Sequence, residues 1–294
     1  MQQNFLDPQV LAAISGLDLV AKTVVQGFIN GLHRSPDFGF SQEFAEYRMY
    51  TPGDDLRHVD WNVFARTERA YLKRYRGETN TRLTVLLDLS KSMAFGTNPT
   101  KLEYARYLVS SLLYLAVQQR DAAGLVLFDD EVRQFIPPSS RIGQLQKLLH
   151  AVEHAEVGQH TNFAKPFSHF LEFIRQRGLV IVVSDFYADP EEIISTIAPL
   201  RWKKNEVVLF HLLDRQEMEP TLNAPATMID MESGHGVEVT PEYVKGEYRT
   251  RILDHMEALK SKAQGAGMDY FLMPTDKPLD AGLREYLSAR QGRM

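Results

Sequence analysis

Three polar side chains occupy alternate positions directly after an apolar run, where a buried strand would end. In the stretch TVLLDLSKSMAFG, residues 84–96, they are Asp88, Ser90 and Ser92. One carboxylate and two hydroxyls at this spacing can turn three oxygens toward one point, which suits a small hard cation that keeps some of its waters. Mg²⁺ fits this chemistry best, with Mn²⁺ or Ca²⁺ as alternatives.

A mostly parallel sheet is expected to position this loop. Short, unbroken runs rich in Leu and β-branched residues are typical of strands covered on both faces. They occur at residues 83–87, 124–128, 179–184, 207–213 and 270–273. Amphipathic stripes predict helices at residues 101–120, 143–155, 164–177, 191–200, 243–266 and 279–289. This alternation predicts an α/β fold with a doubly wound, mostly parallel sheet and helices on both faces.

Two hairpins are expected beside the parallel strands. DDEVRQFIPP, which follows the second apolar run, predicts a short antiparallel return at one edge of the sheet. TMIDMESGHGVEV predicts a second hairpin that turns at Ser233–Gly236, because Ser and Gly there separate two strand-like runs.

Two further residues extend the polar set. Ligands of open α/β sheets collect beyond the carboxyl ends of the strands. Thr161, in GQHTNF, is expected at the start of a helix, and Asp185 ends the buried run VIVVSDF. With Asp88, Ser90 and Ser92 they complete a pattern that resembles the metal-ion-dependent adhesion site of von Willebrand factor A domains.

This resemblance implies a role for each residue. The serines and the threonine would contact the ion directly, and the aspartates would do so directly or through water. One coordination position would stay open for an Asp or Glu of a protein partner. Lys91, His160 and Asn162 adjoin these residues in the sequence and are the expected rim of the partner site. The structural alternative is that Ser90 caps a turn and Asp88 accepts backbone hydrogen bonds.

An enzymatic alternative uses the same carboxylates. A metal-dependent phosphoesterase could employ Asp88 as a phosphoryl-accepting nucleophile together with Asp185. Haloacid-dehalogenase-like hydrolases need a second Asp two residues later, where this chain has Ser90, and a serine cannot act as the general acid at neutral pH. The chain also lacks the P-loop, nucleophile-elbow and zinc-helix signatures. A non-enzymatic role is therefore favoured.

A second motif lies upstream, in EFAEYRMYTPGDDLRHVDWNVFAR, residues 43–66. Its Pro-Gly pair predicts a turn, after which an aspartate can cap a short helix. Nearby acids and arginines favour an ion-pair cluster over a second metal site. Its marked residues, whose role is structural or partner-binding, are Glu46, Arg48, Asp54, Asp55, Arg57, Asp60 and Trp61.

The spacing of this motif resembles the hallmark of the bacterial domain of unknown function 58 family. In that family the hallmark precedes a von Willebrand A-like domain, which is the order found here. The resemblance implies an adaptor that partners a MoxR-type AAA+ ATPase in protein maturation, envelope or stress functions. The expected organisation is residues 1–79, with an N-terminal helix and the hallmark segment packed on the main domain, and residues 80–294, the von Willebrand A-like domain.

Composition limits the remaining function classes. The chain has 294 residues, a net charge of −5 and no cysteine, which excludes disulfides and thiolate zinc sites. The basic, Tyr-containing stretch at residues 66–76 is better explained as a solvated or paired strand than as a nucleic-acid site. Residues 10–32 predict an amphipathic helix with polar residues inside its span, not a transmembrane segment. A cytoplasmic location is the expectation.

Overall fold

The computed structural model describes the chain in several stretches. They are residues 8–11, 16–32, 44–50, 61–67, 69–75, 81–158, 164–174, 176–231, 234–279, 282–284 and 286. The chain divides into two compact units, one formed by residues 1–28 and 81–294 and the other by residues 29–80. The predicted boundary after residue 79 stays a prediction.

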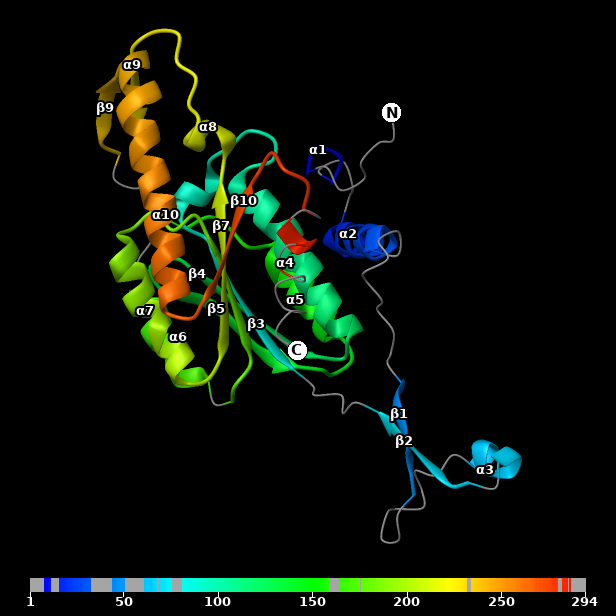
Figure 1. The fold of residues 1–294 in the computed structure, drawn as a ribbon. Helices are drawn as coiled ribbons and strands as arrows, with labels where there is room; N and C mark the ends of the chain where they lie inside the picture. Colours follow the sequence, from blue (N-terminus) through cyan, green and yellow to red (C-terminus); the bar gives the residue numbers. More distant parts are fainter. Residues whose placement is uncertain are drawn as a thin grey trace. The chain divides into compact units, whose positions relative to one another are not determined.

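A six-stranded sheet forms the centre of the larger unit (Figure 1). Its strands are β3 (Arg82–Asp88), β4 (Ala122–Phe128), β5 (Val132–Ser139), β6 (Leu179–Ser184), β7 (Glu206–Leu213) and β10 (Asp269–Pro274). Their order is β10-β7-β6-β3-β4-β5, and every neighbouring pair is parallel except β4 and β5. The predicted doubly wound α/β fold is confirmed, including the antiparallel return at one edge.

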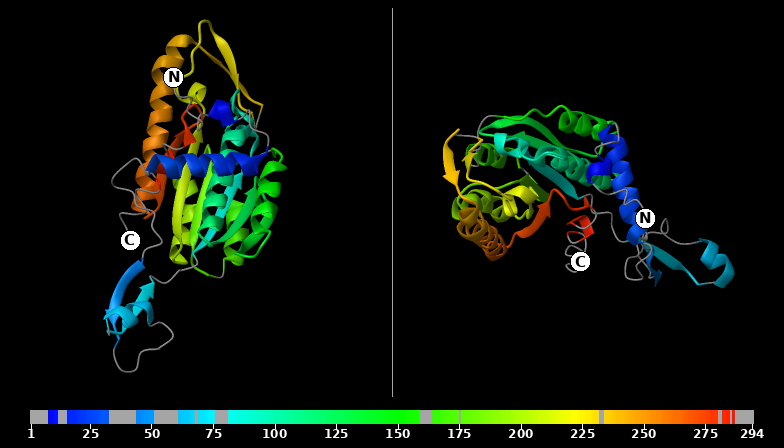
Figure 2. Two further views of the ribbon diagram at one scale, coloured as in Figure 1. Left: turned by 90° about the vertical axis from the view of Figure 1, so that its right-hand side faces the viewer. Right: turned by 90° about the horizontal axis from the view of Figure 1, so that it is seen from above.

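Helices cover both faces of this sheet (Figure 2). One face carries α4 (Lys101–Gln118) and α5 (Gln144–Glu153), which contact β3, β4 and each other. The opposite face carries α6 (Ala164–Phe173), α7 (Pro190–Trp202) and α10 (Arg249–Gly265). Shorter elements are α8 (Arg215–Met218), β8 (Ala226–Ile229), β9 (Gly236–Val239), α9 (Pro241–Tyr243) and the π-helical turn η3 (Val244–Tyr248). The predicted hairpin at residues 227–239 corresponds to the antiparallel pair of β8 and β9.

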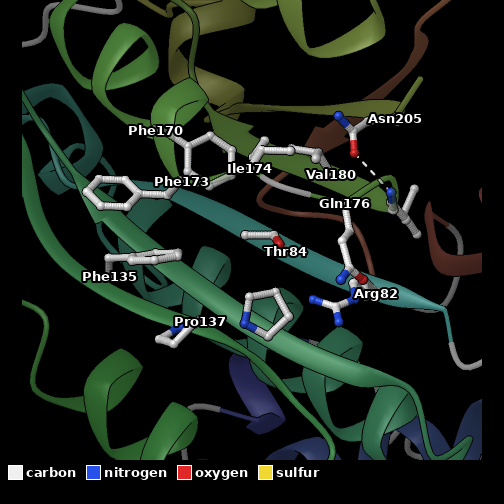
Figure 3. A pocket seen from close by; sticks show the side chains of 13 residues that line it. Arg82, Thr84, Phe135, Pro137, Phe170, Phe173, Ile174, Gln176, Val180 and Asn205 are labelled. Carbon is white, nitrogen blue, oxygen red and sulfur yellow. Dashed lines mark hydrogen bonds between the residues drawn. The ribbon is translucent and has the colours of Figure 1, made fainter. Parts of the chain in front are cut away.

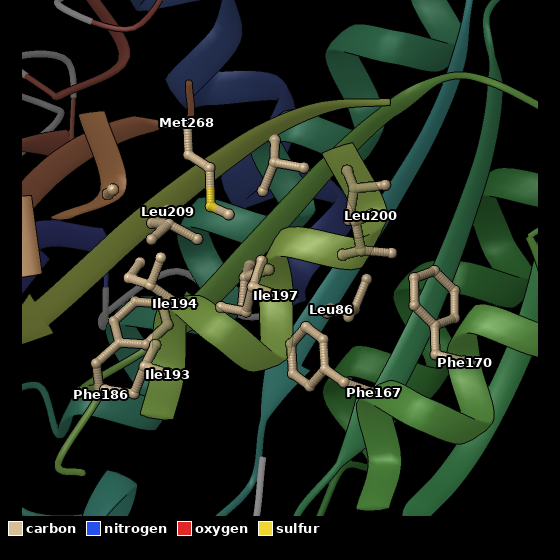
Figure 4. Packing of buried hydrophobic residues seen from close by; sticks show 14 of the residues in the cluster. Leu86, Phe167, Phe170, Phe186, Ile193, Ile194, Ile197, Leu200, Leu209 and Met268 are labelled. Carbon is tan, nitrogen blue, oxygen red and sulfur yellow. The ribbon is translucent and has the colours of Figure 1, made fainter. Parts of the chain in front are cut away.

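The main apolar core lies between the sheet and the helices α6, α7 and α10 (Figure 4). Leu86 of β3, Phe167 of α6 and Ile197 of α7 are all at most 1% exposed. Val85 and Leu87, adjacent to Leu86 on β3, are also buried, and alternation along a strand directs them to the opposite face. Burial on both faces explains the unbroken apolar run that ends at Asp88.

The predicted N-terminal helix is interrupted. Two helices, α1 (Pro8–Leu11) and α2 (Leu17–Leu32), replace the single helix expected over residues 10–32. Gly16, which precedes α2, has a φ of 92°, a left-handed value that an α-helix cannot contain and that glycine adopts without a Cβ penalty. Leu17, Ala21 and Val24 of α2 are buried, as the amphipathic pattern predicted.

Two other helices differ from their predicted bounds. The helix predicted over 164–177 ends at Phe173, and the one predicted over 243–266 consists of α9, η3 and α10. The helix predicted over 279–289 lies partly outside the described residues. The smaller unit contains an antiparallel pair, β1 (Phe44–Met49) with β2 (Tyr71–Tyr75), and the helix α3 (Trp61–Thr67).

A close backbone contact between β4 and β5 explains the glycine at position 124. A Cβ at Gly124 would lie 2.7 Å from the backbone N of Pro138. Gly124→Ala is therefore expected to lower the free energy of unfolding by about 1–3 kcal/mol. Gly246→Ala is the matched control, because no atom lies within 4 Å of a Cβ there. Urea unfolding of both variants measures the effect, and equal stability of the two would contradict the steric explanation.

Candidate functional site at the carboxyl edge of the sheet

The candidate site lies where the chain reverses its direction across the sheet. β3 is hydrogen-bonded to β4 on one side and to β6 on the other. The connection after β3 leads through α4 to β4, whereas the connection after β6 leads through α7 to β7. Such a topological switch point leaves a crevice beyond the carboxyl ends of the two strands. Asp88 is the last residue of β3, and Asp185 directly follows β6.

The Asp88–Ser92 loop brings several of its polar groups within hydrogen-bonding distance of one another. The backbone N–H of Ser90 donates to Asp88 Oδ1 at 2.8 Å, and Ser90 Oγ lies 3.1 Å from Ser92 Oγ. After Ser90 the chain turns into the 3₁₀ helix η2 (Lys91–Ala94). Asp88 and Ser90 are buried, Ser92 is partly exposed, and Lys91 is exposed. Of the three predicted loop ligands, Ser92 is thus the one nearest to solvent.

The end of β6 fixes the Asp88 carboxylate from the other side. Ser184 Oγ donates to Asp88 Oδ2 at 2.6 Å and accepts from the N–H of Phe186 at 2.9 Å. Phe186 has a φ of 49°, a left-handed conformation that costs energy for a bulky residue and often marks functional sites. This turn holds Asp185, which is 1% exposed, at the same edge as Asp88.

The surroundings of Asp88 disfavour its charge. Burial, reinforced by the negative charge of Asp185, raises the pKa of Asp88 from 3.8 to about 7, although hydrogen bonds from Ser184 and Ser90 oppose the rise. The two carboxyl groups therefore repel each other. A cation between them would relieve that repulsion.

A buried lysine, which the sequence reasoning missed, contacts Asp185. Lys101 is 0% exposed, and its Nζ donates to Asp185 Oδ2 and to Glu217 Oε1, each at 2.6 Å. Burial acts to lower the pKa of Lys101, but the charges of Asp185 and Glu217 and their hydrogen bonds together outweigh it and raise the pKa. Lys101 is therefore a charged ammonium at the same edge of the sheet as the predicted metal ligands.

Glu217 and Tyr187 complete the surroundings of this ammonium. Glu217 belongs to α8, where its Oε2 also accepts from the N–H of Asp214 at 2.8 Å. Burial raises the pKa of Glu217 despite the nearby Lys101. The ring of Tyr187 lies 4.8 Å from Lys101 Nζ, a distance at which an aromatic face attracts a cation. Tyr187 is 42% exposed, so it covers the ammonium on the solvent side.

His211 of β7 is a second buried group at this edge that the sequence reasoning missed. Its Nδ1 lies 2.7 Å from Tyr270 Oη, and its Nε2 has no hydrogen-bond partner within the described residues. Burial lowers the pKa of His211 to about 3. The imidazole is therefore neutral at physiological pH and does not balance the carboxylates.

Thr161, His160 and Asn162 lie outside the described residues. Gly158, the last described residue before them, donates its N–H to the carbonyl of Leu89 at 2.6 Å. The chain thus reaches the Asp88–Ser92 loop three residues before Thr161. The predicted roles of Thr161, His160 and Asn162 stay predictions.

The donor set of the described residues fits a hard divalent cation. Two oxygens bound to Mg²⁺ at about 2.1 Å and at right angles lie about 3 Å apart, close to the 3.1 Å between Ser90 Oγ and Ser92 Oγ. The described part of the chain contains no group of three His, Cys, Asp or Glu side chains that could hold a metal. The proposed site does not require such a group, because two carboxylates and several hydroxyls would supply its ligands. Lys101 Nζ already contacts Asp185, so a metal ion would have to displace this ammonium from Asp185 or share the carboxylate with it.

The hallmark residues all belong to the smaller unit, residues 29–80. Glu46 and Arg48 lie on β1, and Trp61 begins α3, where its ring packs edge-on against Phe64 at 5.9 Å. Trp61 is 58% exposed. The remaining hallmark residues lie outside the described part of the chain: Asp54, Asp55, Arg57 and Asp60. The predicted ion-pair cluster among them stays a prediction.

The sequence carried a weak signal for Lys101. Thr100 caps α4 through a reciprocal hydrogen-bond pair with Glu103, which makes Lys101 the first residue of the helix. The helix dipole disfavours a cation at this position, so a lysine there suggests a carboxylate partner from elsewhere in the fold. In the sequence, Glu217 is accounted for by the Asp-x-x-Glu capping box that begins at Asp214. Its second role, as a partner of Lys101, therefore could not be predicted from that motif.

A hollow of about 340 Å³ lies at the opposite, amino end of β3 (Figure 3). It forms beyond the end of α6, with Thr84 on the floor, Arg82 at one end, and Phe135 and Phe173 on the walls. Its two β3 residues, Arg82 and Thr84, precede Asp88 on that strand, and neither Asp88 nor Asp185 lines it, so it is separate from the carboxyl-edge site.

The strand order and the polar switch point together define a doubly wound α/β protein whose candidate site lies at the carboxyl edge. A family model described as "Protein of unknown function DUF58" matches residues 46–258. The chain belongs to this family, as the hallmark spacing predicted.

Relatives and solved structures of lower similarity also match. Uncharacterized proteins of Mycobacterium tuberculosis and Mycobacterium bovis are 24% identical over 294 residues, which cover 97% of this chain and 91% of each relative. The crystal structure of the conserved hypothetical protein BatB from Bacteroides thetaiotaomicron has a TM-score of 0.49 and 16% identity, covering 71% of this chain and 98% of that one. The Rpn10 VWA domain has a TM-score of 0.44 and 14% identity, covering 70% and 95%.

No helix in the described part of the chain is both long enough and apolar enough to span a bilayer.

Proposed function

We propose that this protein is a divalent-cation-dependent protein-binding adaptor without catalytic activity. Mg²⁺ would bind at the switch point through Asp88, Ser90, Ser92, Thr161 and Asp185, and an Asp or Glu of the partner would complete its coordination. The observation that carries this proposal is the geometry of the Asp88–Ser92 loop. The Asp88 carboxylate accepts from the Ser90 N–H, the hydroxyls of Ser90 and Ser92 lie 3.1 Å apart, and a second buried carboxylate, Asp185, follows the neighbouring strand.

The residue type at position 90 favours binding over phosphoryl transfer. Ser90 stands two residues after Asp88, where a phosphoesterase of this kind needs a carboxylic acid. A serine hydroxyl cannot act as the general acid at neutral pH, and the phosphoesterase alternative is therefore not favoured.

Family membership suggests the kind of partner. The resemblance described above points to a MoxR-type AAA+ ATPase, which would present the acidic side chain to the ion. Lys91 and Tyr187 are exposed beside the site and belong to the surface that such a partner would cover.

Calorimetric titration with Mg²⁺ and Mn²⁺ tests the metal-binding half of the proposal. The wild type is expected to bind one ion, and Asp88→Ala is expected to lose that binding, because the carboxylate that orients the serines is absent. Asp130→Ala is the matched control, since Asp130 is a half-exposed carboxylate in the loop after β4. Unchanged binding by Asp88→Ala would refute the site.

Pull-down with a purified MoxR-type ATPase tests the partner half. Capture by the wild type is expected to require Mg²⁺, and Asp88→Ala is expected to lose capture even though it stays folded. Equal capture in Mg²⁺ and in EDTA would refute metal-dependent recognition.

A further inference from the structure

Lys101 occupies a position that a metal ion at this edge would also seek. Its ammonium is fully buried and bridges Asp185, which follows β6, and Glu217 of α8 at equal distances of 2.6 Å. Rings of Tyr187 and Phe95 lie 4.8 and 5.8 Å from Nζ. A buried lysine keeps its charge when carboxylates pair with it in this way, whereas an unpaired one loses its proton.

The charges at this edge are not balanced. Among the described residues at this edge, three carboxylates are buried, those of Asp88, Asp185 and Glu217, and one ammonium, that of Lys101, is buried with them. In the described part of the chain, the other buried carboxylate at the carboxyl end of the sheet is that of Asp129, and Arg133 pairs with it at 2.7 Å. With every carboxyl ionised, the four groups carry a formal charge of −2, which a divalent cation would neutralise.

We propose that Lys101 is an internal cation that competes with the divalent ion for Asp185, and that Glu217 retains the ammonium when the ion binds. This inference rests on the metal site of the proposed function and adds its regulation. In the metal-free state the ammonium bridges both carboxylates. In the loaded state the ion takes Asp185, and the ammonium pairs with Glu217 alone.

The geometry allows this exchange with little movement. The lysine ammonium is a compact charge on a flexible four-carbon stem, and Lys101 stands at the first position of α4, so its side chain can shift while the helix stays in place. Glu217 is anchored independently, because its Oε2 accepts from the N–H of Asp214 and its carbonyl accepts from Tyr248 Oη at 2.9 Å. The second carboxylate therefore remains available to the displaced ammonium.

Two substitutions outside the ligand set are expected to change Mg²⁺ affinity in opposite directions. Lys101→Met removes the competitor and should tighten Mg²⁺ binding by about 10–100-fold. Glu217→Gln leaves Asp185 as the only charged partner of the ammonium, and should weaken binding by about 10-fold or more. Calorimetry with Mg²⁺ alone measures both effects in the full-length protein.

Matched controls separate direct competition from general electrostatics. Lys262→Met and Glu219→Gln make the same charge changes on the exposed ion pairs of Lys262 with Glu191 and of Glu219 with Arg249. Both controls are expected to bind Mg²⁺ as the wild type does. Crystal structures with and without Mg²⁺ provide a second readout, in which Lys101 Nζ should separate from Asp185 and stay beside Glu217.

The outcomes distinguish this inference from the proposed function. Equal Mg²⁺ affinities in the wild type, Lys101→Met and Glu217→Gln would overturn the competition and leave the metal site intact. Changes of Mg²⁺ affinity in the two controls as large as those in Lys101→Met and Glu217→Gln would have the same meaning. Absence of binding in every variant would overturn both. Binding by Lys101→Met alone would support the competition and overturn Mg²⁺-dependent function of the wild type. If Lys101→Met does not fold, Glu217→Gln still tests the competition in the opposite direction.

Discussion

Replacement of Lys101 by methionine is expected to lower the free energy of unfolding by about 3–5 kcal/mol in metal-free buffer. The reason is that Asp185 and Glu217 would lose the cation that each contacts at 2.6 Å while remaining buried. Removal of one partner from a buried ion pair leaves an uncompensated charge, which costs far more than the loss of an exposed pair.

Urea unfolding at pH 8 in EDTA measures this loss. Lys262→Met, which removes an exposed ion pair with Glu191, is the control and is expected to leave the stability nearly unchanged, because solvent screens exposed pairs. Addition of Mg²⁺ should restore part of the stability of Lys101→Met, because an ion that binds only the folded state stabilises it. A loss below about 1 kcal/mol would mean that Lys101 does not balance the two carboxylates.

Asp88→Asn is expected to be more stable than the wild type at pH 8 in EDTA, by up to about 4 kcal/mol. The pKa of Asp88 rises from 3.8 to about 7 on folding, chiefly because of burial and secondly because of Asp185. The folded state therefore binds a proton more tightly than the unfolded state. This contribution to stability is fully present below about pH 4 and is lost as the pH rises through about 7.

Unfolding in urea at pH 5, 6, 7 and 8, with EDTA present, tests this prediction. The asparagine has no proton to lose, so the variant should lack the decline that the wild type shows as the pH rises toward 8. Addition of Mg²⁺ should make the wild type more stable than Asp88→Asn, because only the wild type has the Asp88 carboxylate whose charge the ion would offset. Parallel pH profiles of the two proteins, or stabilisation of both by Mg²⁺, would contradict the role assigned to Asp88.

Local sequence patterns were sufficient for the sheet and for the Asp88–Ser92 loop. A strand that is buried on both faces is apolar along its length, and the apolar run that ends at Asp88 therefore predicts such a strand. Asp88 and Ser90 interact within the loop itself, so their convergence depends on neighbours in the sequence. The N-terminal helix shows where hydrophobic periodicity fails as a predictor. The apolar pattern continues across Gly16, but the left-handed backbone of Gly16 interrupts the helix there.

The sequence by itself determined the α/β fold class, the family and the positions of Asp88, Ser90, Ser92 and Asp185 at strand ends, since hydrophobic period and motif spacing are local properties. Only the tertiary structure decided what surrounds those carboxylates. Lys101 and Asp185 are 84 residues apart, and Lys101 and Glu217 are 116 apart, so no pattern along the chain pairs them. Burial raises the free energy of each isolated charge, and the fold must therefore bring these three together from separate elements, which makes their pairing a property of the packed sheet edge.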